Sequence, residues 1–325
     1  MVEEMTLPQL YARGRENLEK QGYRRFFPPE SAVNSSVEAN RKYLDSLFFE
    51  TRFFDPPEVD TSTTLFGTKL KTPVFCSPIS GLSQLSSTAL ADIATGLKEA
   101  GSLFMLGIGG TQDIESAVAT GVPVVKIIKP YRKTGTIYDQ LKDAERLGCV
   151  AVGMDIDHFY GALREGGKIA MTDLFAPQKT DEIRKIIAST KLPFIIKGIL
   201  SLQDAKRALE IGASAIVVSN HGSSSVEFGV PSAVALPKIV EAVGARMTVL
   251  IDTGFKTVSD VLKGLALGAK SIGLASSVIL AWGAGGAKGV ETLVNLITAE
   301  LRRTMAATGC ASVESVKRGI IVEVA

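Results

Sequence analysis

The stretch that decides the fold is IIKGILSLQDAKRALEIGASAIVVSNHG, residues 195–222. It consists of an apolar run that ends at Lys197 and Gly198, an amphipathic segment, and a second apolar run that ends in the polar residues 219–222. Both apolar runs are continuous rather than alternating, which is typical of strands covered on both faces in a parallel sheet. The stretch therefore predicts a strand–helix–strand unit in which polar residues follow each strand.

The same texture repeats from about residue 72 onward. The apolar runs are PVFCS (73–77), LFMLGI (103–108), VPVVKII (122–128), VAVGMD (150–155), PFIIKG (193–198), AIVVSN (215–220), TVLID (248–252) and SIGLAS (271–276). Helical patterns follow them at 87–100, 114–120, 138–147, 181–190, 202–211, 232–243, 258–267 and 289–305. Eight strand–helix units in about 235 residues predict an α/β fold, a (β/α)8 TIM barrel. A doubly wound sheet stays the alternative, because the spatial order of the strands cannot be read from sequence.

Two segments do not fit the repeat. Residues 1–60 are polar, with helical patterns at 7–20 and 36–48, and are expected to form a helical extension packed on a barrel of residues 61–325. About 25 residues separate the fourth strand from the next helix, and long loops in compact domains are usually functional or disordered. This loop carries His158, Tyr160 and Arg164, so it is expected to be a lid over the site or a flexible insert.

Composition narrows the class of protein. The chain has 325 residues, of which 46% are hydrophobic and 22% charged, with a net charge of +2. No block of like charges and no membrane-length apolar run occurs, so neither a nucleic-acid nor a membrane partner is expected. Cys76, Cys149 and Cys310 form no metal-binding pattern, and MVEEMTLPQL is no secretory leader. Buried thiols in a cytoplasmic protein without a metal site are therefore expected.

The chemistry-bearing residues lie at predicted strand ends, where the loops of a barrel build its active site. The chain has only two histidines, His158 and His221, and each follows a strand. This placement favours a general base. His221 is the stronger candidate because the rigid run AIVVSN precedes it and Gly222 follows it.

Lys197 ends an otherwise apolar strand. A buried ammonium is costly unless an acceptor or an anion faces it. The candidates are an ion pair with Asp155 or Asp252 and a bound cofactor that becomes negative on reduction. After the seventh and eighth strands, Gly254 and Gly273 fall where barrels commonly bind phosphate.

Together these segments resemble the FMN-dependent α-hydroxy acid oxidases and dehydrogenases, a family that includes glycolate oxidase and flavin-linked L-lactate dehydrogenase. Residues 195–222 resemble the family's "VKG…A…GA.AI.VSNHG", and residues 250–273 resemble "DGG.RRGTDV.KALALGA.AV.IG". Residues 59–81 resemble its entry into the first strand, and residues 301–318 its final helix. The resemblance covers nearly the whole chain.

The resemblance implies FMN as cofactor and assigns roles by position. His221 matches the catalytic base, Lys197 the lysine at flavin N1 that stabilises the reduced ring, and Asp155 the carboxylate that orients the histidine. The implied cofactor-binding residues are Ser77, Ile79, Ser80, Gly107, Lys126, Lys197, Ser219, Asp252, Gly254, Lys256 and Gly273. The implied substrate-binding residues are Phe26, His158, Arg164, His221 and Ser224.

Several positions depart from the family pattern. Ser224 replaces an arginine that clamps the substrate carboxylate, and Phe26 replaces a tyrosine that helps to bind substrate. On the third strand, Ile128 aligns with a tyrosine and Lys126 with a glutamine. One hydroxyl cannot replace a bidentate, charge-assisted clamp. Near the phosphate, Leu274 replaces one arginine, and a lysine, residue 256, replaces another.

These features predict an FMN-dependent oxidoreductase that oxidises a 2-hydroxy acid or related carbinol, larger or less acidic than glycolate or lactate. Two alternatives stay open: a flavin barrel with a non-redox activity, such as type 2 isopentenyl diphosphate isomerase, and a member that has lost FMN and acts as a lyase or binding protein. The resemblance also implies a homo-tetramer or homo-octamer.

Overall fold

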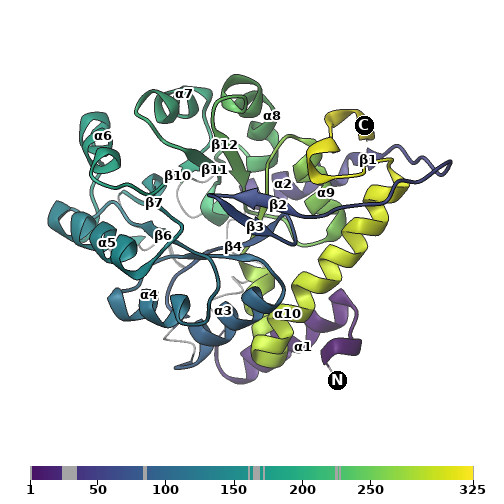
Figure 1. Cartoon of the computed structure of the whole chain (residues 1–325), viewed down its shortest axis with the longest axis horizontal. Coiled ribbons are helices and arrows are strands. Elements are labelled where there is room, and N and C mark those ends of the chain that lie inside the picture. Colours follow the sequence, from purple (N-terminus) through teal and green to yellow (C-terminus); the bar gives the residue numbers. More distant parts are fainter. Residues whose placement is uncertain are drawn as a thin grey trace.

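Eight parallel strands close into a barrel at the centre of the molecule (Figure 1). The computed structural model describes residues 2–23, 35–82, 86–159, 162–163, 169–170, 173–223, 226 and 228–324. Around the barrel the strands are β4 (Val74–Ile79), β5 (Leu103–Leu106), β6 (Val124–Ile128), β7 (Ala151–Asp155), β10 (Phe194–Ile199), β11 (Ala215–Val218), β12 (Thr248–Ile251) and β13 (Ile272–Leu274). The predicted (β/α)8 barrel is confirmed, and closure of the sheet excludes the doubly wound alternative.

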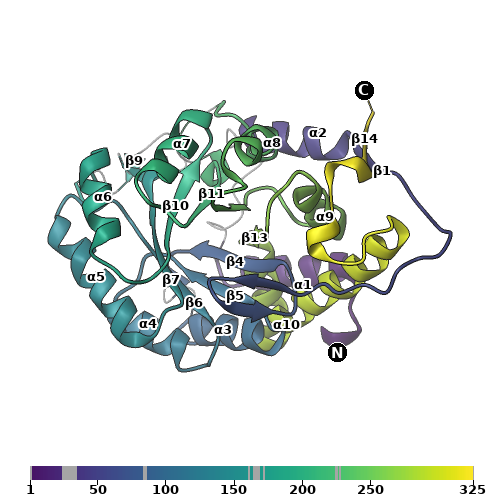
Figure 2. The same cartoon turned by 45° about the horizontal axis from the view of Figure 1, so that its top comes forward.

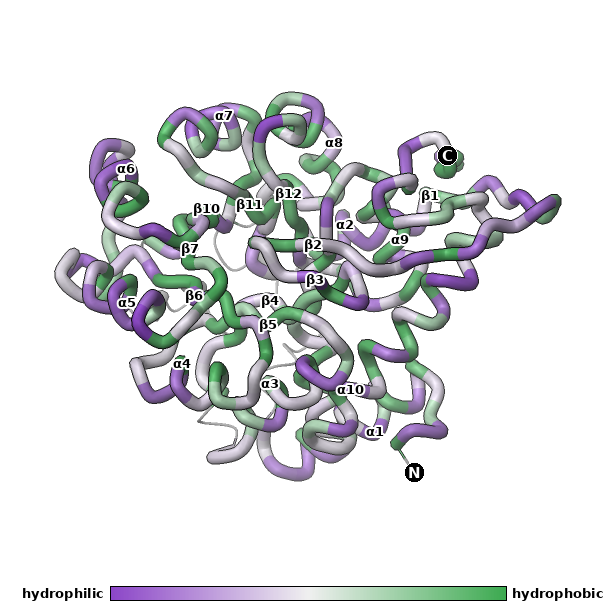
Figure 3. The backbone as a smooth tube through the Cα atoms, viewed as in Figure 1, coloured by the Kyte–Doolittle hydropathy of each residue, from purple (hydrophilic) through white to green (hydrophobic). Residues whose placement is uncertain are grey.

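Helices surround the barrel, so each strand is covered on both faces (Figures 1 and 2). The helices that follow barrel strands are α3 (Ala89–Glu99), α4 (Thr111–Val118), α5 (Thr134–Leu147), α6 (Thr180–Ala188), α7 (Leu202–Glu210), α8 (Ser232–Val243), α9 (Val258–Ala266) and α10 (Ser276–Ala307). One apolar cluster fills the barrel, and a larger one lies between strands and helices. Figure 3 shows the apolar strands at the centre and hydrophilic residues on the outer helices.

A short hairpin closes one end of the barrel. It consists of β2 (Thr63–Leu65) and β3 (Thr68–Leu70), and it directly precedes β4, so it lies at the amino ends of the strands. Leu65 and Leu70 belong to the apolar cluster inside the barrel. Because this end is plugged by apolar side chains, polar chemistry is left to the carboxyl ends.

The amino-terminal segment packs against the outside of the barrel. Helix α1 (Leu7–Lys20) crosses α10 closely, since a Cβ on Gly14 would lie 1.9 Å from the Leu280 carbonyl oxygen. Helix α2 (Ser35–Asp45) is shorter than the predicted helix at 36–48, because the chain then enters β1 (Leu47–Phe49). The boundary between an extension of residues 1–60 and the barrel stays a prediction.

Two elements depend on contacts that are distant in sequence. Strand β1 pairs antiparallel with β14 (Ile321–Glu323), so a segment that precedes the barrel strands lies beside the carboxyl-terminal segment. Helix α10 begins well before the predicted residue 289, and its backbone is non-helical at Gly285 and Gly286. The long loop after β7 contains β8 (Ala162–Leu163) paired with β9 (Ile169–Ala170). Among the described residues, no helix combines the length and the apolarity that a membrane crossing requires.

Candidate active site

Three charged side chains form a row across the carboxyl ends of three neighbouring strands. Lys197 of β10 is the register partner of Asp155, the last residue of β7, and Lys129 directly follows β6 on the other side. The Lys129 ammonium lies 2.5 Å from Asp155 Oδ2, and the Lys197 ammonium lies 3.8 Å from Asp155 Oδ1. All three side chains are buried. A buried carboxylate between two buried cations offsets part of the desolvation cost of each charge.

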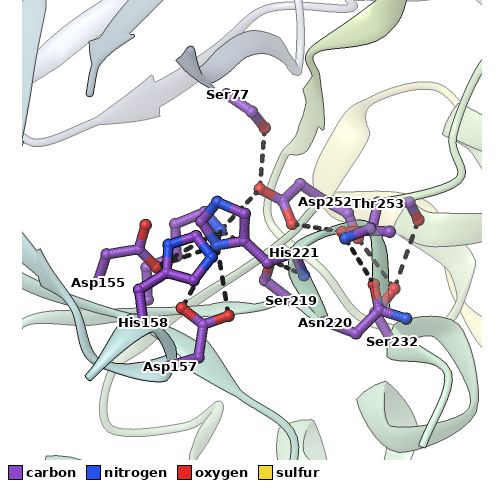
Figure 4. A network of polar contacts seen from close by, with 12 residues as sticks. Ser77, Asp155, Asp157, His158, Ser219, Asn220, His221, Ser232, Asp252 and Thr253 are labelled. Carbon is purple, nitrogen blue, oxygen red and sulfur yellow. Dashed lines mark hydrogen bonds and ion pairs between the residues drawn. The ribbon is translucent and has the colours of Figure 1, made fainter. Parts of the chain in front are cut away.

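His221 follows β11 and lies beside this row (Figure 4). Its Nδ1 atom is 3.4 Å from Asp155 Oδ1, 3.3 Å from Asp157 Oδ2 and 3.4 Å from Lys197 Nζ. The backbone of His221 has a φ of 52°, a left-handed conformation that few residues other than glycine adopt. Such conformations persist where the surrounding structure holds them, and they cluster at functional sites.

The second histidine packs against the first. The ring centroids of His158 and His221 are 3.8 Å apart, with their planes inclined by 43°. His158 is buried in the single turn η4 (Ile156–His158), and its Nδ1 lies 2.6 Å from Lys129 Nζ. Both histidines that the sequence placed at strand ends therefore lie together at the mouth of the barrel.

Burial and neighbouring charges set the protonation states. For His221, burial lowers the pKa, but Asp155 and Asp157 outweigh it and the nearby lysines, so the pKa is raised above its usual 6.5. For Asp155, burial raises the pKa, but the surrounding cations hold it well below its usual range. Burial, together with the charges of His221 and Lys129, lowers the pKa of His158 to about 2. At neutral pH, a charged carboxylate and a neutral imidazole therefore flank His221.

Lys197 also connects this centre to the opposite side of the barrel. Its ammonium donates to Ser219 Oγ at 2.8 Å and lies 3.5 Å from Asp252 Oδ2, which accepts a hydrogen bond from Ser77 Oγ at 3.0 Å. Burial lowers the pKa of Lys197, but Asp155 and Asp252 raise it above its usual value, so the lysine stays charged. A permanent positive charge therefore lies inside the mouth.

Residues predicted to face the cofactor ring also meet at the ends of β4 and β5. A Cβ on Gly107 would lie 3.0 Å from the Ile79 carbonyl oxygen and 3.0 Å from Ser80 Oγ. Ser80 Oγ in turn accepts a hydrogen bond from the Ile108 N–H at 3.3 Å. The backbone approach is thus close enough that a side chain at Gly107 would require its neighbours to shift.

The predicted phosphate end has few charges. A Cβ on Gly254, whose φ is 84°, would lie 2.5 Å from Asn40 Nδ2, so this turn has room only for glycine. Lys256 is exposed, and its backbone N–H donates to the Asp260 carboxylate. Leu274 is buried in the layer between strands and helices.

The register of β6 corrects the alignment on the third strand. Ile127 belongs to the cluster inside the barrel, whereas Ile128 packs with the outer helices. Lys126 shares that outer side, because side chains alternate along a strand. Its ammonium donates to the carbonyls of Gly107 at 2.5 Å and Gly109 at 3.0 Å, and burial lowers its pKa to about 8. The polar residue of this strand that reaches the mouth is Lys129.

Some predicted residues cannot be placed, and two were missed. Phe26, Arg164 and Ser224 lie outside the described residues. Asp157 and Lys129 contact the centre but were given no role from the sequence. Asp157 stands two residues after Asp155 in the run DIDH, so position alone could have identified it. Lys129 directly follows an apolar strand, but only the register of that strand shows that its side chain reaches the mouth.

The carboxylates and imidazoles at the mouth are also of the kinds that bind metal ions. Asp155, Asp157, His158 and His221 each offer a ligand atom, and these atoms lie within 4.8 Å of one another. Both oxygens of Asp155, however, lie within ion-pair distance of ammonium groups, which a metal cation would have to displace. The expectation of no metal at this place stays a prediction.

Fold and site together define a barrel enzyme with a histidine–carboxylate centre and a buried lysine beside it. The sequence profile of the FMN-dependent dehydrogenase family matches residues 15–177 and 166–323. The chain belongs to this family: it is an FMN-dependent oxidoreductase, and FMN is its cofactor. The prediction from the sequence is thereby confirmed, and the alternative of a chain without FMN is not supported.

Characterised relatives cover most of the chain. It is 31% identical to L-lactate oxidase from Lactobacillus jensenii, over 81% of this chain and 72% of that protein. It is 29% identical to 4-hydroxymandelate oxidase from Amycolatopsis orientalis, over 90% of this chain and 91% of that protein. A solved structure of mandelate oxidase superposes with a TM-score of 0.87 at 28% identity, covering 98% of this chain and 97% of the other.

The described residues fit the ring of FMN better than its phosphate. The donors at the mouth include a charged, buried lysine and the hydroxyl of Ser219, while Ser77 donates its hydroxyl to Asp252. The Nδ2 donor of Asn220, which follows β11, is buried and has no hydrogen-bond partner among the described residues. A ring with carbonyl and nitrogen acceptors matches such donors. Lys197, Ser219 and Asn220 are therefore the donors that would hold it, and Asp252, a carboxylate positioned by Ser77, would accept from a ring N–H.

Proposed function

We propose that the protein oxidises a 2-hydroxy acid or a related carbinol that is larger or less acidic than glycolate or lactate. FMN, when bound, supplies the two-electron acceptor. The observation that carries the proposal is the imidazole of His221, whose Nδ1 faces two carboxylates at 3.3–3.4 Å while a charged lysine lies beside it. This is the arrangement of a general base held in one tautomer.

The role of His221 follows from its neighbours. When Nδ1–H donates to Asp155 or Asp157, Nε2 carries the lone pair and accepts the proton of the substrate, from its hydroxyl or its Cα. Two anions beside Nδ1 then stabilise the imidazolium that forms, as the raised pKa of His221 indicates. We assign the proton transfer to His221, and the orientation of its ring to Asp155 and Asp157.

Lys197 has a different task. It lies 3.5–3.8 Å from Asp252 and Asp155, and these carboxylates keep it protonated at all working pH values. A fixed ammonium in a buried site stabilises negative charge that develops near it without reorganisation. We assign Lys197 to the electron-rich edge of the flavin ring, where reduction leaves negative charge.

The substrate class rests on what surrounds the base. Lys129 reaches the mouth at the end of β6, but Asp155 already neutralises its charge. Ser224 and Phe26 stand where the family pattern has an arginine and a tyrosine. Relatives named 4-hydroxymandelate oxidase and L-lactate oxidase show that the family accepts both aryl and small substrates. Weaker binding of a substrate carboxylate favours larger or less acidic carbinols as substrates.

The test is anaerobic reduction of the bound flavin, followed by its absorbance. Mandelate, its ring-substituted forms and the matching amides and esters are compared with glycolate and lactate. The proposal predicts reduction by at least one larger or uncharged substrate, at a rate far above that of glycolate or lactate. Turnover of glycolate or lactate at ordinary enzyme rates would contradict the substrate class. No reduction by any of these carbinols would contradict the oxidation itself.

The assembly and the compartment are proposed on separate grounds. Large apolar side chains are exposed on the β1–β14 pair, where Phe48 and Val322 are register partners, and shortly after it in sequence at Phe53 and Phe54. Exposed apolar residues of this kind often mark contacts between subunits, which supports a homo-tetramer or homo-octamer. Light scattering of the purified protein measures its mass. The cysteines are buried thiols, which supports a reducing compartment such as the cytoplasm.

A further inference from the structure

Lys129 is a buried lysine whose ammonium, within the part of the chain that the structure describes, contacts two neighbours of His221. It directly follows β6, and its side chain is 4% exposed. Its ammonium lies 2.5 Å from Asp155 Oδ2 and 2.6 Å from His158 Nδ1. Neither contact is needed to close the barrel, whose strands at this level are joined by backbone hydrogen bonds. The cost of burying this charge therefore points to a role in the site.

The contact with His158 fixes the state of that ring. A lysine ammonium has three donors and no acceptor, so a ring nitrogen 2.6 Å away must accept. Nδ1 of His158 is therefore unprotonated, and its proton lies on Nε2. A second proton on the ring would place two cations in contact, in agreement with the lowered pKa of His158. His158 stays a neutral ring whose tautomer Lys129 determines.

Both groups that Lys129 holds contact His221 directly. Asp155 Oδ1 lies 3.4 Å from His221 Nδ1, and the ring of His158 lies against the ring of His221 at 3.8 Å. The remaining charged groups that face His221 are Asp157 of η4 and Lys197 of β10. Asp157 shares the turn η4 with His158, and Lys197 comes from β10 on the other side of β7, whereas the Lys129 ammonium contacts Asp155 and His158.

We propose that Lys129 is a positioning residue for His221: it orients Asp155, holds His158 as the neutral Nε2–H tautomer, and so keeps the catalytic imidazole in one place. The proposal rests on the proposed function of His221 as base. Lys129 also has an electrostatic effect, because its positive charge beside Asp155 weakens the attraction between that carboxylate and the protonated ring of His221. Lys129 thus lowers the pKa of His221, which would otherwise release its proton less readily.

The chain allows this proposal to be tested without any substrate, because it contains only two histidines. Nuclear magnetic resonance of protein with ¹⁵N- and ¹³C-labelled histidine, loaded with FMN, reports the tautomer and the pKa of each ring. In the wild type, one histidine is expected to titrate above its usual pKa, and the other to stay neutral as the Nε2–H tautomer down to acid pH. A His158 in the Nδ1–H tautomer overturns the proposal.

The decisive variant is Lys129→Met, which keeps the length of the side chain and removes its charge. Loss of a cation near Asp155 is expected to raise the pKa of His221 by about one unit, since a charge within 4–6 Å shifts a pKa by this amount or more. His158 is expected to lose its single tautomer. The acid limb of kcat/KM for flavin reduction moves to higher pH by the same amount. If neither histidine changes its pKa or tautomer, the role of Lys129 is only structural and the proposal fails.

Lys126→Met is the matched control. Lys126 is a buried lysine of the same strand, but it faces the outer side and donates to backbone carbonyls. Its removal is expected to leave both histidine titrations where they are in the wild type. If Lys129→Met does not fold, two other measurements still test the proposal. The first is the tautomer of His158 in the wild type. The second is the pKa of His221 in the variant His158→Phe, which the proposal expects to differ from the wild-type value. If the wild-type protein shows no oxidase activity, the proposed function is contradicted, but the histidine titrations still test the role of Lys129.

Discussion

The two ends of the cofactor site are built in different ways. At the predicted ring end, β6, β7, β10 and β11 bring lysine, aspartate and histidine side chains into contact at 2.5–3.8 Å, and Lys129, Asp155 and Lys197 are buried. At the phosphate end, after β12 and β13, the chain presents glycine turns, a buried Leu274 and an exposed Lys256. Charge is thus concentrated at the end predicted to hold the ring, and the end predicted to hold the phosphate offers mainly backbone groups.

The largest effect is expected from His221→Asn. Asparagine keeps a polar group but cannot accept a proton, and general bases contribute about 10²–10⁴-fold to rate. We expect the rate of flavin reduction to fall by about 10³-fold while FMN stays bound, because the variant leaves Lys197 and the phosphate end intact. Stopped-flow absorbance measures the rate, and the flavin spectrum measures binding. A variant with the wild-type rate would show that another group is the base.

Lys197→Met is expected to affect both binding and stability. It removes the cation that lies 3.5–3.8 Å from Asp155 and Asp252, and leaves buried carboxylates with less compensation. Breaking a buried ion pair in this way costs about 3–5 kcal/mol. Chemical denaturation measures the loss of stability, and ultrafiltration measures the released FMN. Equal losses from Lys256→Met would contradict the contrast between the two ends.

Asp157→Asn separates the two carboxylates that face His221. It removes a negative charge 3.3 Å from Nδ1, and this charge raises the pKa of His221. We expect the acid limb of kcat/KM to move to lower pH by about one unit. The limb is read from flavin reduction across a pH series. An unmoved limb would mean that Asp155 alone sets the pKa of the base.

The smallest effect is expected from Lys256→Ala at the phosphate end. Lys256 is exposed, and exposed charge pairs contribute about 0.2–1 kcal/mol, which corresponds to roughly 1.4- to fivefold in affinity. The expected result is a slightly larger dissociation constant for FMN and an unchanged rate in the loaded enzyme. Fluorescence titration of the apoprotein with FMN measures the constant. A loss as large as that of Lys197→Met would show that the phosphate end depends on charge after all.

The sequence predicted the barrel well because the information is local. Each strand is a continuous apolar run, and each neighbouring helix is amphipathic, so the order of elements follows without knowledge of distant contacts. Helix α1 and helix α8 have the predicted bounds, and α7 is one residue shorter than predicted. Strand β1 was predicted as the end of a helix, since its partner β14 lies at the other end of the chain.

The site was predicted only in part, because some of its contacts join residues that are distant in sequence. The structure brings His221, Asp155 and Lys197 together, and the sequence singled them out because each stands at or just after the end of an apolar run. Lys129 was not singled out, because a strand that is apolar on both faces does not reveal which of its residues point inward. The register of β6 supplies that information: it places Lys129, rather than Ile128, at the mouth of the barrel. The contact between the two histidine rings likewise exists only in three dimensions.

The central claim is that His221 must lose its proton before it accepts one from the substrate. Its pKa is raised above 6.5, so the protonated, inactive form prevails below that pKa and the active form above it. The most direct measurement is the rate of anaerobic flavin reduction in the wild type across a pH series. The rate is expected to rise with pH through a single pKa above 6.5 and then to level off. A rate that is independent of pH, or that falls as pH rises through this range, would contradict the account.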